Sequence, residues 1–232
     1  MREEVLSALL ATNKELSREE PEVEANIGLQ MEHMGLESWS ISVRRRIRDT
    51  ISHLQPSSII FAGAGIGHLA AWVLDYLSES ESSTKVQLIE EGNRFAVILK
   101  RLCDRYDKVD TNIVVGTSSL LVGELTAWNI TKQGNPPIYP EADAIIVNSN
   151  INKLADDIDI MLKILSTNGV LLTIEPTPPV GEREPSDPEV VGVNKWMELI
   201  KSTNDSHHIA FAPLFGGTIV AWFAKNTNLK QE

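Results

Sequence analysis

The stretch that decides the fold is "SSIIFAGAGIGHLAAWVL", from Ser57 to Leu74. A short apolar run leads into glycines at positions 63, 65 and 67, and an apolar pattern of helical spacing follows. Glycine permits positive φ and a close approach of the backbone to a ligand. The first turn of a helix adds free N–H groups and a positive dipole end. The stretch therefore predicts a strand, a tight ligand-binding loop and a helix.

The spacing of these glycines discriminates between ligands. A dinucleotide fingerprint needs a glycine three residues after the second one, which would be position 68. That position holds His68, and Gly63, Gly65 and Gly67 form a G-x-G-x-G pattern instead. The spacing disfavours NAD.

Apolar runs of strand length alternate with helical patterns along the chain. The strand candidates are Ser58–Phe61, Lys85–Ile89, Thr111–Val115, Ala144–Val147 and Gly169–Ile174, and the helix candidates are His68–Leu77, Arg94–Tyr106, Ile151–Leu165 and, more weakly, Thr117–Asn129. This alternation predicts an α/β fold whose parallel sheet is covered on both faces. Two runs near the C-terminus, His208–Ala212 and Thr218–Ala224, predict a hairpin and hence an antiparallel last strand. We expect seven strands, six parallel and the last antiparallel.

The organisation around this sheet is also readable. Residues 1–54 have a charged helical pattern and are expected to be an N-terminal helical extension, with residues 55–232 forming one structural unit. The polar segment Pro176–Pro188 is expected to be an exposed loop or lid.

Composition narrows the function classes. Lysine and arginine number 21 and aspartate and glutamate 32, so the net charge is 21 − 32 = −11, which disfavours nucleic-acid and anionic-membrane partners. The basic run Arg44–Arg48 fits a solvated helix face better than a polyanion site. Cys103 is the single cysteine, and we expect it to be buried and structural in a reducing compartment. The longest apolar run contains three glycines and a histidine, so no membrane span is expected, and we predict a cytoplasmic protein.

An acid follows the second predicted strand. Glu90 directly continues the run Lys85–Ile89, across the expected crevice from the glycine loop. There its carboxylate can accept two hydrogen bonds from a ribose diol. The alternative is an acid that merely occupies an exposed strand end.

These motifs together resemble the class I S-adenosylmethionine-dependent methyltransferases, and more narrowly the small O-methyltransferases related to catechol and caffeoyl-CoA enzymes. The likeness rests on "IIFAGAGIGHLAAWVL", "VQLIEE", "NIVVGTSS", "ADAIIVNSN", "ILSTNGVLLTIE" and "APLFGGTIVAWFAK", in that order and over nearly the whole chain. It implies a Rossmann-like methyltransferase sheet, S-adenosyl-L-methionine as cofactor and a small-molecule methyl acceptor. The implied cofactor residues are Gly63, Ala64, Gly65, Gly67 and Glu90.

The resemblance also suggests a homodimer, because relatives of this group are commonly dimers. Trp39 and Ile41 could supply the seam, or they could cap the chain's own active site.

Several positions depart from the family pattern. Phe61 replaces the acid ahead of the glycines, and Thr117 replaces an aspartate that commonly faces the adenine amino group. Thr117 and Ser118 offer hydroxyls there, or they are ordinary turn hydroxyls. These departures make a non-catalytic relative that binds a nucleotide-like ligand or a partner the second hypothesis, after the methyltransferase. An NAD(P) oxidoreductase is the third.

The metal site of the catechol-type enzymes is also altered. Its two aspartates and one asparagine correspond to Asn148, Ile174 and Glu175, and hard divalent cations need more anionic oxygens than these supply. We therefore expect no metal. The implied catalytic candidates are Asn148 and, as a fallback general base, Lys153. Methyl transfer without a metal is physically possible because alignment of a reactive donor can supply much of the rate.

Overall fold

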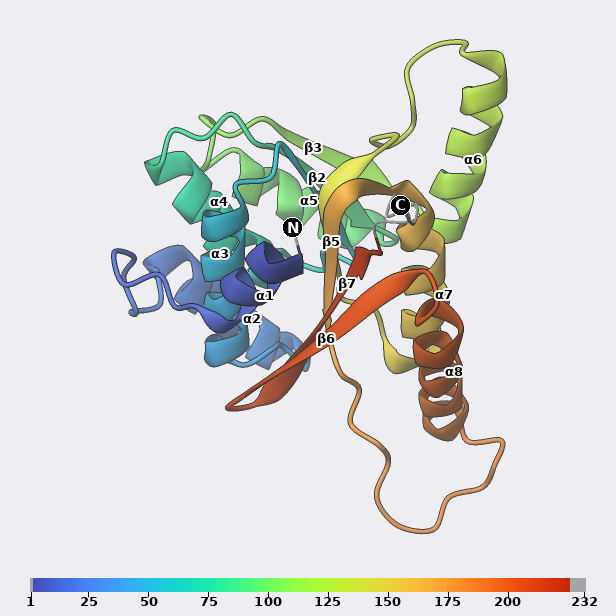
Figure 1. The fold of residues 1–232 in the computed structure, drawn as a ribbon. Coiled ribbons are helices and arrows are strands. Elements are labelled where there is room, and N and C mark those ends of the chain that lie inside the picture. The colour runs from blue at the N-terminus through green and yellow to red at the C-terminus, as the bar shows by residue number, and fades with distance from the viewer. Residues whose placement is uncertain (1, 226–232) are drawn as a thin grey trace.

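A computed structural model describes residues 2–225 and shows a seven-stranded sheet in the order β3-β2-β1-β4-β5-β7-β6 (Figure 1). The strands are β1 (Ser58–Ala62), β2 (Lys85–Glu90), β3 (Thr111–Val115), β4 (Ala142–Val147), β5 (Leu165–Ile174), β6 (His207–Leu214) and β7 (Gly217–Ala224). Strands β1 to β5 are parallel, and β7 runs antiparallel to both of its neighbours, β5 and β6. The predicted sheet is confirmed, with the antiparallel last strand lying between β5 and β6.

The helices alternate with the strands as the sequence predicts. They are α1 (Arg2–Leu10), α2 (Glu22–Met34), α3 (Ile41–Leu54), α4 (His68–Glu79), α5 (Asn93–Cys103), α6 (Ser118–Thr131), α7 (Ile151–Met161) and α8 (Pro188–Thr203). Helix α7 ends earlier than predicted, because a 3₁₀ turn, Leu162–Ile164, leads into β5 at Leu165. Helix α8 was not predicted.

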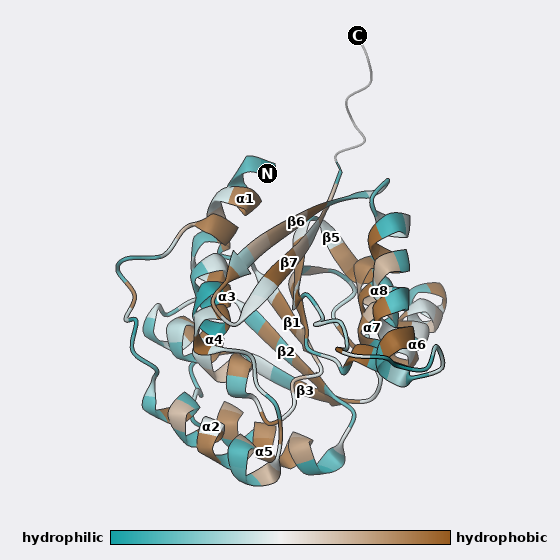
Figure 2. Cartoon of the chain, turned by 90° about the horizontal axis from the view of Figure 1, so that it is seen from below, coloured by the Kyte–Doolittle hydropathy of each residue, from teal (hydrophilic) through white to brown (hydrophobic). Residues whose placement is uncertain are grey.

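Helices cover both faces of the sheet, α1 to α5 on one side and α6 to α8 on the other (Figures 1 and 2). Side chains of β1 alternate between the two cores: Ile59 and Phe61 pack on the α1–α5 side, and Ile60 and Ala62 on the other. Both faces of this strand are therefore apolar, which is why its sequence is an uninterrupted hydrophobic run.

Helices α1 to α3 share the core of the sheet, and this overturns one expectation. Arg44 and Arg48 do not lie on a solvated face; they are 6% and 5% exposed. Arg44 pairs with Glu20 and Arg48 with Asp49, and both guanidinium groups lie beside the Trp72 ring, with centroid distances of 5.8 and 5.2 Å. Ion pairing and aromatic contact make the burial of these charges tolerable.

The segments expected to surround the ligand gather at the carboxyl edge of the parallel strands. The irregular segment 175–187 leaves β5 there, and the β6–β7 turn returns to the same edge, at the bottom of Figure 1. Cys103 is buried, as predicted. Within residues 2–225, none of the helices is both long enough and apolar enough to span a bilayer.

Candidate functional site

The glycine loop between β1 and α4 adopts the conformation that its composition predicts. Gly63, Gly65 and Gly67 have φ angles of 77°, 58° and 90°. The N–H groups of Gly63 and Ala64 both donate to the Ile89 carbonyl, at 3.1 and 3.0 Å. The loop is thus held against the end of β2 by backbone hydrogen bonds.

Each of these glycines meets a different environment. A Cβ on Gly63 would lie 2.4 Å from the Asn148 carbonyl oxygen, and one on Gly67 would lie 2.4 Å from Cδ2 of Leu102. A Cβ on Gly65 would meet no atom within 4 Å. Gly63 and Gly67 therefore allow close packing, whereas Gly65 faces open space at the middle of the loop.

Glu90 ends β2 beside this open side of the loop and is 9% exposed. Its Oε2 accepts the Gly65 N–H at 2.7 Å, and its Oε1 accepts the Gly92 N–H at 3.0 Å. An ionised carboxylate has about four acceptor positions, so roughly two remain. The carboxylate is oriented by the backbone and can still accept hydrogen bonds from a diol.

Phe61 and Thr117 show what the departures from the family pattern do. Phe61 is 3% exposed and packs into the core on the α1–α5 side, so it presents no polar group. Thr117 caps α6: its Oγ1 accepts the Leu120 N–H at 3.2 Å, while its hydroxyl hydrogen can still be donated. Ser118, the first residue of α6, is 5% exposed.

The two candidate catalytic residues lie on the far side of β1 from Glu90. Asn148 is exposed at the end of β4, and its N–H donates to the Ala62 carbonyl at 2.8 Å. The Lys153 ammonium forms an ion pair with Glu91 at 2.7 Å, and this hydrogen bond raises the lysine pKa. The structure brings both residues to the carboxyl edge, but Lys153 is engaged with an acid.

The positions that correspond to the metal ligands do not form a cluster of acids. Ile174 is half-buried and Glu175 is exposed. Among residues 2–225, no three histidine, cysteine, aspartate or glutamate side chains gather in a way that could hold a metal ion. Metal independence stays a prediction.

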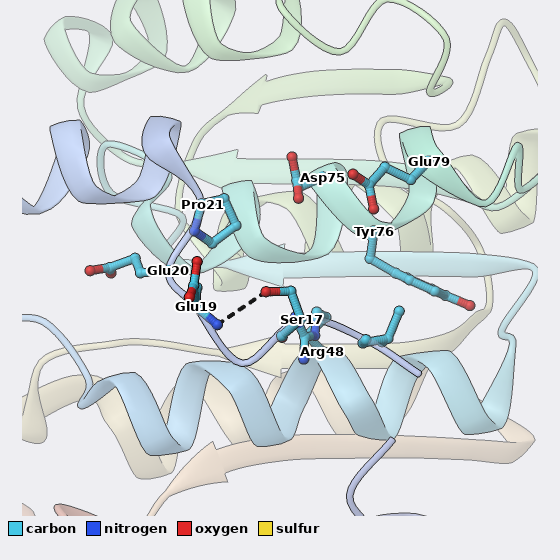
Figure 3. Close-up of a pocket in the computed structure, with 9 residues that line it drawn as sticks. Ser17, Glu19, Glu20, Pro21, Arg48, Asp75, Tyr76 and Glu79 are labelled. Atoms are coloured by element: carbon cyan, nitrogen blue, oxygen red, sulfur yellow. Dashed lines mark hydrogen bonds between the residues drawn. The ribbon is translucent and has the colours of Figure 1, made fainter. Parts of the chain in front are cut away.

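A pocket of about 240 Å³ lies away from this edge, beside the C-terminal half of α4 (Figure 3). Its lining includes four carboxylates, those of Glu19, Glu20, Asp75 and Glu79. The glycine loop precedes the first residue of α4, so this pocket belongs to a different part of the molecule. An acidic lining alone identifies no ligand.

Two features of the site escaped the sequence analysis. Gly92 orients Glu90 through its N–H, and the His68 side chain is enclosed by residues from the N-terminal helices. A signal for the second was present: Arg44 and Arg48 fall at i, i+4 and share a stripe with Ile47 and Ile51, which is the spacing of a buried helix face.

Comparison with known proteins rests on structure alone, since no family model and no curated protein matches the chain. An O-methyltransferase from Bacillus cereus in complex with SAH is 15% identical, with a TM-score of 0.65 over 89% of this chain and 92% of the other. The O-methyltransferase TomG from Streptomyces achromogenes, involved in tomaymycin synthesis and solved with SAM, is 16% identical, with a TM-score of 0.66 over 95% and 94%.

A third similar structure is a putative caffeoyl-CoA O-methyltransferase from Staphylococcus aureus, 14% identical, with a TM-score of 0.64 over 88% and 93% of the two chains. At these identities the likeness establishes the fold, and a fold by itself does not establish a reaction. The chain has the fold of the class I S-adenosylmethionine-dependent O-methyltransferases, including those of caffeoyl-CoA type.

Proposed function

We propose that this protein is an S-adenosyl-L-methionine-dependent methyltransferase that methylates an oxygen of a small molecule without a metal. The observation that carries the proposal is the Gly65–Glu90 contact. It places a backbone-oriented carboxylate with free acceptor positions beside the one loop glycine that faces open space.

The residues present fit an adenosyl cofactor. Glu90 would accept hydrogen bonds from the ribose hydroxyls, and the loop Gly63–Gly67, with Ala64, would line the ribose and amino-acid side. Thr117 and Ser118 would face the base, where Thr117 can donate its hydroxyl hydrogen. When bound, the cofactor supplies a sulfonium methyl group as the electrophile. The chain's own part is to bind and orient it.

The acceptor is expected to ionise without help from this chain. A general base works best with a pKa near the operating pH. Lys153 does not meet this condition because Glu91 raises its pKa, and Asn148 carries no basic group. A pre-ionised or easily ionised hydroxyl is therefore a better acceptor than a diol that depends on metal chelation. The net charge of −11 adds no support for a nucleic-acid substrate.

The proposal is tested by product formation. The protein is incubated with S-adenosylmethionine and a series of phenols of decreasing pKa, and release of S-adenosylhomocysteine is measured with and without EDTA. We expect turnover that increases as the phenol pKa falls toward the assay pH, because the ionised fraction rises, and that does not change with the chelator. Binding of S-adenosylhomocysteine with no turnover on any acceptor would favour the non-catalytic alternative, in which the fold only binds a ligand or a partner.

A further inference from the structure

The His68 side chain connects the glycine loop to the N-terminal helices. His68 is the first residue of α4, directly after Gly67, and is 7% exposed. Its Nδ1 lies 2.7 Å from Ser38 Oγ in the connection between α2 and α3. Its Nε2 is hydrogen-bonded to the guanidinium of Arg44 on α3.

Two further neighbours of this ring, Glu20 and Gly28, come from the same N-terminal segment, residues 20–44, which we call the cover. Glu20, just before α2, places Oε1 3.6 Å from the His68 Nε2 and 2.8 Å from the Arg44 Nη1. Gly28, on α2, packs against the imidazole so closely that a Cβ there would lie 3.3 Å from the ring. Residues spread along the cover, from Glu20 to Arg44, thus meet at one side chain.

The hydrogen bonds define the protonation state of His68. A guanidinium has donors only, so Nε2 is the acceptor in the Arg44 contact. The proton of the neutral ring is therefore on Nδ1, which donates to Ser38. Burial and the Arg44 charge lower the His68 pKa to about 4, so the ring is neutral at physiological pH.

The glycine loop is consequently held at two points. Glu90 accepts the N–H of Gly65 at its centre, and His68 continues directly from Gly67 at its end. Gly67 has little freedom of its own, because its N–H donates to the Ala64 carbonyl at 2.9 Å and its Cα packs against Leu102. A displacement of the His68 side chain would be transmitted to the loop.

We propose that His68 is a positioning residue, through which the cover holds the glycine loop in its cofactor-binding conformation. This inference rests on the proposed function, because its effect is measured as affinity for the cofactor product. Coupling between two sites is reciprocal, so a ligand on the loop should also stabilise the cover.

The first test compares three variants by calorimetry with S-adenosylhomocysteine. His68→Phe keeps a ring but removes both hydrogen bonds, and we expect its Kd to rise by about 5- to 150-fold, the usual range of coupling between sites. His68→Gln keeps an acceptor for Arg44 and should retain most of the affinity. The matched control is His33→Phe, which changes an exposed histidine on the same cover. Wild-type affinity in a folded His68→Phe variant would overturn the proposal.

Ser38→Ala is the second variant if His68→Phe does not fold. It removes the acceptor of the Nδ1 proton, together with the hydrogen bond that the Ser38 hydroxyl donates to the Trp39 carbonyl, from an exposed connection. We expect a smaller rise in Kd in the same direction, and an unchanged Kd would count against the proposal. A histidine with a purely structural role would change the melting temperature but not the affinity.

Two further readouts separate this inference from the proposed function. A long-range ¹H–¹⁵N spectrum should show His68 protonated at Nδ1 and not at Nε2 at pH 7, whether or not the cofactor binds. S-adenosylhomocysteine should slow amide exchange in α2 of the wild type but not of His68→Phe. Failure of wild-type binding with the Nδ1 tautomer present would reject the proposed function, and the positioning role with it. Binding without protection of α2 would reject the positioning role alone.

Discussion

The Nζ atom of Lys153 lies 2.7 Å from Oε2 and 2.9 Å from Oε1 of Glu91. The pair joins the start of α7 to the residue after β2. Strand β4 precedes α7, and β2 and β4 lie on either side of β1. The pair therefore links the two sides of the glycine loop, which follows β1. Both side chains remain about half exposed.

From this ion pair we predict that Lys153 is protonated and that the pair contributes little to the free energy of unfolding. Glu91→Gln should lower the Lys153 pKa toward its ordinary value of about 10.4, because the hydrogen bond that raises it is lost. An exposed pair contributes at most about 1 kcal/mol, so the free energy of unfolding should change little. NMR titration of ¹³C-methylated lysines and urea denaturation check both statements. A Lys153 pKa near neutrality in the wild type would restore it as the general base.

Glu24 predicts an unusual dependence of stability on pH. It is fully buried, and neither carboxylate oxygen has a hydrogen-bond partner among the described residues. Burial, with smaller contributions from Asp75 and Glu20, raises its pKa from 4.5 to about 7. Between these values the folded state binds more protons than the unfolded state, so this group makes stability fall as pH rises. His68 acts oppositely between about pH 4 and 6.5, because its folded pKa is lowered.

Glu24→Gln isolates the first effect. The amide keeps the shape but cannot ionise, so the variant should be more stable than the wild type by about 1–3 kcal/mol at pH 8. The difference should shrink to near zero by pH 4, where the wild-type carboxyl is protonated in both states. Urea denaturation of both proteins at several pH values measures it. A variant that is less stable at pH 8 would mean that Glu24 has a charged partner.

Metal addition should change nothing. Mg²⁺ gives up its waters reluctantly and needs anionic ligands, and the edge between Asn148 and Glu175 supplies a single carboxylate. We expect no heat on titration with Mg²⁺ and no effect of EDTA on any turnover. Activity on catechols that appears with Mg²⁺ and vanishes with EDTA would show that the assignment of these positions is wrong.

Exposed apolar side chains at and beside the β6–β7 turn indicate where we expect a homodimer to form. Phe215 is 89% exposed, and its carbonyl accepts a hydrogen bond from Ser40 at 3.0 Å, next to Ile41, which is 38% exposed. We expect a dimer whose seam includes these apolar side chains. Light scattering should give twice the chain mass for the wild type and the single mass for Phe215→Asp. Ile130→Asp, at an apolar residue on α6 that is 82% exposed, is the control. A monomeric wild type at micromolar concentration would reject the seam.

Local signals explain why so much of the fold was predictable. The strands are apolar runs that end at polar residues. The glycines at 63, 65 and 67 have positive φ, which the loop requires whatever lies around it. Helix α8 was missed although Asp187 caps it and Pro188 begins it, which is a recognisable start signal.

The rest depended on contacts distant in sequence. The burial of Arg44 requires Glu20, just before α2, and His68 and Trp72, both on α4, so its charge alone suggested a solvated face. The sequence did not show that Thr117 would cap α6 or that Lys153 would pair with Glu91, because both contacts depend on the folded chain.

The central claim is most directly tested by calorimetric titration of S-adenosylhomocysteine into the wild type and the neighbouring variants Glu90→Ala and Glu91→Ala. We expect the wild type to bind, and to give no heat with NAD. Loss of Glu90 should cost about 1–3 kcal/mol, the range for hydrogen bonds to a charged group, whereas Glu91→Ala should bind like the wild type. Absence of wild-type binding, or equal affinities in Glu90→Ala and Glu91→Ala, would contradict the assignment of this loop and carboxylate to an adenosyl cofactor.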